Sequence, residues 1–123
     1  MLISIHALVP RVERHHRLIE ELRATAPRAL SAGSLAGRLG VSARTIERDL
    51  ADLLEAGVPV ISRRGPGGGY AIDARSVLPP LIFTPGEASA LVASLAAVGP
   101  RASASAQRAL AKLIEALYQD GAP

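Results

Sequence analysis

Two arginines four residues apart carry the clearest chemistry in this sequence of 123 residues. Arg44 and Arg48 follow Ser42, a residue type that favours the N-cap of a helix. A helix from about Ala43 to Ala56 would place both guanidinium groups on one side. Arginine can donate paired hydrogen bonds to a guanine edge, and it also neutralises phosphates. The spacing therefore predicts a helix that contacts DNA with its charged face.

The other side of the same helix is apolar. Ile46, Leu50 and Leu53 fall on one stripe at 100° per residue. For an isolated helix, an ordinary amphipathic helix with a solvated charged face would be the better interpretation. Here Gly40 and Val41 precede it as the tight turn of a helix-turn-helix, because glycine supplies backbone freedom and the valine can fill the angle between the helices. This turn favours DNA binding.

The residues before the turn predict two more helices. A first helix is expected from Pro10, a residue suited to the first helical position, to about Ala24. Residues 28–30 could form a short strand. Ser31 is placed to cap a second helix, which ends at the turn.

A β-hairpin is predicted after the arginine-bearing helix, which should end at Gly57. Its strands are Val58–Ser62 and Tyr70–Ile72, and its glycine-rich tip carries Arg63 and Arg64. A hairpin in this place is a wing whose arginines are expected to meet phosphates or the minor groove, the alternative being a mobile, solvated tip. The glycines match neither a Walker motif nor a dinucleotide-binding motif, so nucleotide binding is not expected.

The polar residues near the two helix arginines have structural as well as DNA-binding interpretations. Ser42 is first an N-cap, and its position also suits a phosphate. Thr45 lies where it would meet a thymine methyl group or a phosphate. Glu47 could accept from cytosine, but an ion pair with a neighbouring arginine is the better interpretation, and Asp49 is assigned a structural pairing role. The residues predicted to contact DNA are Ser42, Arg44, Thr45, Arg48, Arg63 and Arg64.

The composition argues against several classes of function. The chain has no cysteine, so disulfides, thiolate catalysis and thiolate-bound zinc are excluded. Aromatic residues make up 2% of the chain, too few for the stacking platforms that bind single-stranded nucleic acids. His15 and His16 are adjacent and would point about 100° apart on a helix, so surface residues are expected rather than metal ligands. No catalytic arrangement is evident, and we expect no enzyme activity, metal or cofactor.

The net charge of +3 lies in the first part of the chain. Ten arginines and seven acidic residues precede Asp73, whereas the chain from Asp73 onward contains four basic and four acidic residues. A polyanionic partner is therefore expected for the first part. No apolar run approaches the roughly 20 residues of a membrane span, and Met1–Val9 lacks the basic region of a signal peptide. We expect a cytoplasmic protein that does not bind membranes.

Two further helices are predicted to form a C-terminal hairpin. Thr84 and Glu87 make a capping box around Pro85, and Gly99–Pro100 separates the two helices. Their apolar surface is larger than a two-helix hairpin can hide, so a homodimer through these helices is expected, with packing onto the winged domain as the alternative. This surface comprises Leu91, Val92, Leu95, Leu110, Leu113, Ile114 and Leu117.

The predicted fold is mainly α-helical with a small β-hairpin, a winged helix-turn-helix followed by a two-helix hairpin. Residues 1–10 are expected to be an N-terminal extension and residues 11–73 the winged domain. Residues 74–83 would be a connector and residues 84–120 the helical hairpin.

Three segments at fixed distances carry a family resemblance: Val41–Leu50, Gly57–Val60 and Gly67–Tyr70. Together with the connector at Leu78–Ala88, they resemble the winged helix-turn-helix of DeoR-like bacterial regulators, particularly those with a WYL ligand-sensing domain. The resemblance covers nearly everything after residue 10 and implies a DNA-binding regulator.

Two departures from this family are present. Ala43 occupies a position where the family often has a second arginine. The alanine would remove one phosphate contact. The chain ends at Pro123, where the family continues into its effector-binding domain, so a regulator lacking the WYL domain and its small-molecule effector is expected.

The sequence thus predicts a transcriptional regulator that binds double-stranded DNA sequence-specifically. The helix from Ala43 would enter the major groove, and the basic wing would lie along the backbone or minor groove. One alternative is a winged-helix module for protein–protein contacts, which would not need arginines on both the helix and the wing. Another is a truncated remnant that folds but binds no operator tightly.

Overall fold

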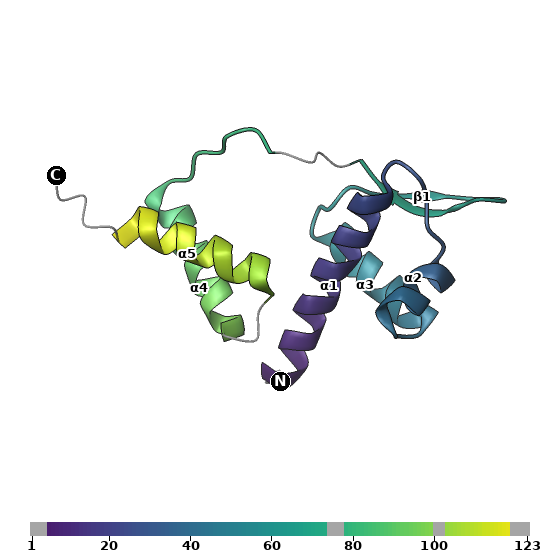
Figure 1. The fold of residues 1–123 in the computed structure, drawn as a ribbon, viewed down its shortest axis with the longest axis horizontal. Coiled ribbons are helices and arrows are strands. Elements are labelled where there is room, and N and C mark those ends of the chain that lie inside the picture. The colour runs from purple at the N-terminus through teal and green to yellow at the C-terminus, as the bar shows by residue number, and fades with distance from the viewer. Residues whose placement is uncertain (1–4, 74–77, 100–102, 119–123) are drawn as a thin grey trace. The chain divides into compact units, whose positions relative to one another are not determined.

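The computed structural model describes residues 5–73, 78–99 and 103–118, with side chains from residue 10 onward. The described chain is mainly helical with one two-stranded antiparallel hairpin, which confirms the predicted fold class (Figure 1). None of the described helices is long and apolar enough to cross a membrane. In chain order the elements are α1 (Ile5–Thr25), α2 (Ala32–Leu39), α3 (Ala43–Glu55), β1 (Val60–Arg63), β2 (Gly69–Ile72), α4 (Pro85–Val98) and α5 (Ala104–Tyr118).

The chain divides into two compact units. One is Arg14–Val77, and the other comprises Met1–Glu13 with Leu78–Pro123. The first unit holds the main apolar core, to which α1, α2, α3 and the hairpin all contribute. The fully buried apolar side chains of this core are Leu18, Leu22, Leu35, Ile46 and Leu50.

The start of α1 differs from the prediction. The helix begins at Ile5 and Pro10 lies inside it, whereas Pro10 was expected at the first helical position. Proline lacks the N–H that would bond to the carbonyl of His6, so it removes a single bond of the ladder. Because the remaining bonds on either side are kept, a proline this close to a helix start does not mark the start itself.

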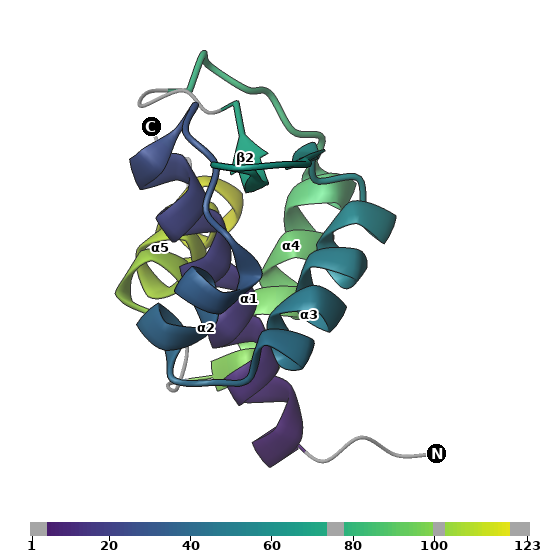
Figure 2. The ribbon, with the colours of Figure 1, turned by 90° about the vertical axis from the view of Figure 1, so that its right-hand side faces the viewer.

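The helix-turn-helix forms from the local signals in the sequence (Figure 2). Ser31 caps α2, its Oγ accepting from the amide of Ser34 at 3.0 Å. Gly40 then ends α2 with φ of 71°, a left-handed conformation that favours glycine. Ser42 caps α3, and Gly57 follows its end with φ of 97°. The predicted turn, caps and helix stop are confirmed.

The hairpin follows α3 as predicted, with shifted limits. The strands pair from Val60 opposite Ile72 to Arg63 opposite Gly69, so Arg63 belongs to β1 and not to the tip. The tip projects away from the helices of its unit (Figure 1). The expected short strand at residues 28–30 is reduced to Leu30, which forms an isolated bridge with Tyr70 through N–H···O distances of 2.8 and 2.7 Å. This bridge ties the hairpin to the segment that leads into α2.

The second unit contains α4 and α5, which pack against each other. The capping box that opens α4 is confirmed: Glu87 and Thr84 each bond the other's backbone amide, at 2.9 and 3.1 Å. Of α4 only Ala88 and Val98 are buried, and α5 has no buried residue. The two helices therefore leave much of their apolar surface exposed within the described structure.

The approach of β2 to Leu30 predicts a glycine requirement. A Cβ at Gly69 would overlap the carbonyl group of Leu30 and the amide of Ser31, and φ at Gly69 is +138°. Gly69→Ala should therefore lower the free energy of unfolding by about 1–3 kcal/mol, measured by urea denaturation. The matched control is Gly37→Ala, where a Cβ meets nothing within 4 Å and α-helical alanine is preferred. This control should be neutral or stabilising by up to about 1 kcal/mol. Equal effects of the two substitutions would contradict the prediction.

Candidate nucleic-acid interface

The outer face of α3 presents two guanidinium groups that are bonded to no other residue in the described ranges. Arg44 and Arg48 are exposed, on the side of the helix away from the buried Ile46 and Leu50. The structure gives neither arginine a hydrogen bond or ion pair to another described residue. Together with two further residues of α3 they line a shallow, open depression, whose lining residues are Arg44, Glu47, Arg48 and Ala51. This face can receive an anionic partner without first breaking an internal contact.

The ion pair predicted for Glu47 is wrong. Glu47 is exposed, and within the described residues it forms no ion pair with either arginine. Glu47 comes three residues after Arg44 and directly before Arg48. These spacings permit only weak surface ion pairs, because the attraction is opposed by the loss of side-chain entropy and by hydration. The carboxylate therefore leaves both guanidinium groups available.

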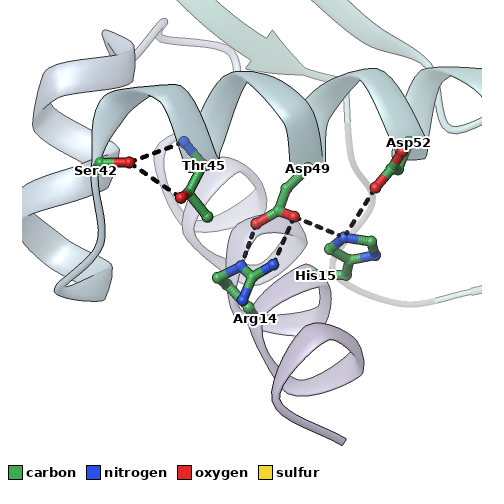
Figure 3. Close-up of polar contacts among 6 residues, drawn as sticks. All are labelled: Arg14, His15, Ser42, Thr45, Asp49 and Asp52. Atoms are coloured by element: carbon green, nitrogen blue, oxygen red, sulfur yellow. Dashed lines mark hydrogen bonds and ion pairs between the residues drawn. The ribbon is translucent and has the colours of Figure 1, made fainter. Parts of the chain in front are cut away.

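Ser42 and Thr45 form a small polar cluster at the start of α3 (Figure 3). The Oγ of Ser42 accepts from the amide of Thr45 at 3.1 Å, and the two hydroxyl oxygens are 3.0 Å apart. Ser42 is exposed and Thr45 is half-buried. The cap confirms the structural role of Ser42, and it holds the N-terminus of α3, where backbone amides and the helix dipole favour anions, at the surface.

The wing supplies a second pair of exposed cations. Arg63 is the last residue of β1 and Arg64 follows it in the turn, and both are exposed. Neither has an ion-pair partner in the part of the chain that the structure describes. The turn after them depends on glycine, with positive φ at Gly65 and Gly67. The two arginines are thus carried on a tight hairpin end.

A buried ion pair joins the inner side of α3 to α1 (Figure 3). Asp49 is 2% exposed. Its Oδ2 accepts from Nε of Arg14, its Oδ1 accepts from Nη2 of Arg14 at 2.8 Å, and Oδ1 lies 3.0 Å from Nε2 of His15. The structural pairing role predicted for Asp49 is confirmed, but sequence reasoning did not identify either partner.

The expectation of a surface residue does not describe His15. His15 and His16 are both half-buried, and His15 lies between α1 and α3, where its Nε2 is also 3.8 Å from Asp52. The helical spacing that separates the two histidines is also what turns one of them toward α3. The sequence signal for this contact was the position of Asp49 beside the apolar stripe of its helix. A carboxylate that becomes buried there requires a cationic or hydrogen-bonding partner somewhere in the fold.

Burial by itself raises the pKa of the Asp49 carboxyl. Hydrogen bonds from Arg14 and His15, together with the charges of these two residues, outweigh burial and hold the pKa below its usual value. In turn, the hydrogen bond to Asp49 raises the pKa of Arg14. Asp49 is therefore ionised across the neutral range, with the Arg14 guanidinium as its counter-ion.

His15, Asp49 and Asp52 also resemble a set of metal ligands, since each offers one ligand atom within 4.8 Å of the others. Arg14 already bonds both oxygens of Asp49, and its positive charge would repel a metal ion there. The cation at this place is the guanidinium. The cluster is best described as an ion pair between two helices.

The lowered pKa of Asp49 predicts a pH-dependent contribution to stability. Asp49→Asn should lower the free energy of unfolding by about 1–3 kcal/mol at neutral pH, because Arg14 keeps its charge and loses its counter-ion. The folded-state pKa lies below the unfolded value of about 3.9, so the difference between the wild type and the variant should be largest above about pH 5 and shrink as the pH falls below about 4. Urea denaturation over a pH series measures it.

The control for this experiment is Asp52→Asn, because the Asp52 side chain is 52% exposed. It should change stability little and with little pH dependence. A wild-type advantage over Asp49→Asn that stays constant down to about pH 2.5 would contradict the assignment of Asp49 as the titrating group.

Residues 14–71 match the model of a family described as HTH domain. No match was found among solved structures. The matched residues coincide with the unit that contains α2, the glycine turn, α3 and the hairpin. Residues 14–71 are therefore similar to an HTH domain, and their structure contains the helix-turn-helix and the hairpin described above.

Proposed function

We propose that this chain is a cytoplasmic transcriptional regulator that binds double-stranded DNA sequence-specifically. The observation that carries the proposal is the pair of exposed arginines on the outer face of α3, which bond to no other described residue and lie within the matched helix-turn-helix segment. A B-DNA major groove admits one α-helix, and arginine is the most frequent side chain to read guanine there. In this arrangement Arg44 and Arg48 face the base edges and the nearer phosphates.

The ends of the interface would position the helix. Ser42 and Thr45 lie at the N-terminus of α3, where a phosphate is favoured, and Thr45 also offers a methyl group for contact with thymine. Arg63 and Arg64 on the wing would meet the backbone or the minor groove. The function thus needs cations at two separate places in one domain, and the structure has exposed arginines at both.

The subtype we propose is a DeoR-like bacterial regulator of the WYL type. Its support is the spacing of the three sequence motifs, which lie at the turn and first half of α3, between α3 and the start of β1, and at the hairpin tip leading into β2. A winged-helix module for protein–protein contacts is less well supported. Such a module would have no need of unpaired arginines on both α3 and the wing, and a remnant without operator binding would have no need to keep them.

Removing the α3 arginines should weaken DNA binding without unfolding the protein. Arg44→Ala and Arg48→Ala should each cost about 1–3 kcal/mol of affinity for a preferred duplex if the arginine reads a base. A phosphate contact would instead cause a similar loss on every sequence. Fluorescence anisotropy with a duplex selected from a random pool, and with its scrambled counterpart, separates these outcomes. The matched control is Arg23→Ala on α1, whose local pair with Glu20 is exposed.

The same titrations test the wing through their salt dependence. With about four phosphates neutralised per chain, log K should fall with log salt at a slope of about −3 to −4. Arg63→Ala/Arg64→Ala should make this slope shallower by up to about 2.

Unchanged binding in the Arg44→Ala/Arg48→Ala double variant, at normal thermal stability, would refute the role of α3.

We also propose that α4 and α5 form the contact of a homodimer. The described part of α5 buries no residue, and Leu91, Ile114 and Tyr118 are 37%, 41% and 64% exposed. The only charged side chain of α4 is Glu87, at its N-terminus, so little repulsion opposes association of two copies. A two-fold dimer would read a pseudo-palindrome with half-sites about 10–10.5 base pairs apart or a multiple of this.

A charge placed on this surface should dissociate the dimer. Leu91→Asp/Ile114→Asp changes side chains that are exposed in the single chain, so the variant should stay folded and become monomeric by light scattering at tens of micromolar. Lys112→Asp is the matched control, because it lies about 160° around α5 from Ile114. A wild type that is monomeric at this concentration would defeat the proposal, and so would an unfolded double variant, since the surface would then belong to the chain's own core.

A further inference from the structure

The hydrophobic effect favours burial of one side of α3 but does not select one exact rotation of the helix. Ile46, Leu50 and Leu53 bury the inner side of the helix, and apolar packing is largely non-directional. A rotation of α3 by about 10° would move side chains on a helix about 10–12 Å across by about 1 Å. Paired hydrogen bonds to a base tolerate displacements of only about 0.5 Å. Reading DNA therefore requires a directional contact that holds the helix.

The contact between Asp49 and Arg14 has this directional character (Figure 3). Nε and Nη2 of Arg14 donate to the two oxygens of Asp49, so the planar guanidinium and the planar carboxylate are aligned by two parallel bonds. His15, the next residue of α1, approaches Oδ1 from its own direction at 3.0 Å. The carboxylate is thus fixed from two successive positions of α1.

Asp49 is also well placed to transmit this restraint. It follows Arg48 directly and comes five residues after Arg44, near the middle of α3. Its side chain is 3% exposed, against 24% for Arg14, so the pair lies where competition from water is weak. The inner carboxylate is held by α1, while the outer arginines form no hydrogen bond or ion pair with described residues. Their direction is therefore inherited from the inner side of the helix.

We propose that Arg14, with His15, is a positioning residue for DNA recognition, which sets the rotation of α3 and so the direction in which Arg44 and Arg48 point. The proposal rests on the DNA-binding function proposed above. A buried ion pair contributes little stability compared with a well-packed apolar pair of similar size, and its measurable effect is on geometry. The sequence discrimination of the protein should therefore depend on Arg14 more than its folding or its affinity for random DNA does.

The test compares discrimination in variants of the full chain that remain folded. The double variant Arg14→Met/Asp49→Leu removes both charges together, so no unpaired charge is left buried. The readout is the ratio of affinities for a duplex selected by the wild type from a random pool and a scrambled duplex of the same length, at one salt concentration. For the double variant we expect a random-duplex affinity within about threefold of the wild type and a ratio lowered by about tenfold or more.

Two further variants make the result specific. Arg14→Lys keeps the charge but replaces the paired donors by one ammonium group, so it should lower the ratio by a smaller factor. Arg23→Gln is the matched control on the same helix, because its pair with Glu20 is exposed and within α1, and it should leave the ratio unchanged. If the double variant does not fold, Arg14→Lys decides between the outcomes.

A folded double variant, or Arg14→Lys in its place, that keeps the wild-type ratio would overturn the positioning role while leaving the proposed function intact. A wild type that binds the selected and scrambled duplexes equally, or neither of them, would overturn both. A lowered ratio at preserved random-duplex affinity supports the proposal, since loss of stability alone would weaken binding to both duplexes alike.

Discussion

A charge that is taken out of water must be paired, and this requirement governs how the helices of the winged unit meet. Asp49 lies on the buried side of α3, which it shares with Ile46, Leu50 and Leu53. Its carboxylate therefore has to find donors on another element, and α1 supplies them from Arg14 and His15. With α3 held against α1 in this way, the turn at Gly40 sets the position of α2 relative to α3. Arg44 and Arg48 then lie on the exposed face of α3. The buried and the exposed chemistry of α3 are thus two results of one orientation.

The elements of the winged unit could be predicted because their limits depend on local chemistry. Ser31 and Ser42 cap helices, and Gly40 adopts a left-handed conformation, whatever the remainder of the fold does. The predicted start of α1 was wrong, because a proline marks a helix start only when no helical turn precedes it, and here α1 begins five residues before Pro10. The partner of Asp49 could not be predicted, since it comes from an element 35 residues earlier in the sequence and nothing local distinguishes Arg14 from other arginines of α1.

The candidate interface was predictable to the same degree. The exposure of Arg44 and Arg48 follows directly from the apolar stripe on the other side of the helix, and the structure confirms it. The prediction for Glu47 was wrong because surface ion pairs are decided by small differences between Coulomb attraction, hydration and side-chain entropy. The contacts made with DNA stay predictions. The C-terminal helices show the opposite limit: the capping box of α4 is local and was predicted, but the contribution of α5 to any further packing does not follow from local signals.

The bridge between Leu30 and Tyr70 has a consequence for how the domain assembles. Its two residues lie 40 positions apart, and the whole helix-turn-helix lies between them. Such a non-local contact has a high loop-closure cost, so it forms favourably only after the intervening helices have shortened the distance between its ends. The docking of the hairpin onto Leu30 should thus come late in the folding of this unit, whereas the β1–β2 pairing is local and has a small closure cost. The exposed arginines of the hairpin, Arg63 and Arg64, would then reach their final position only after α3 is in place.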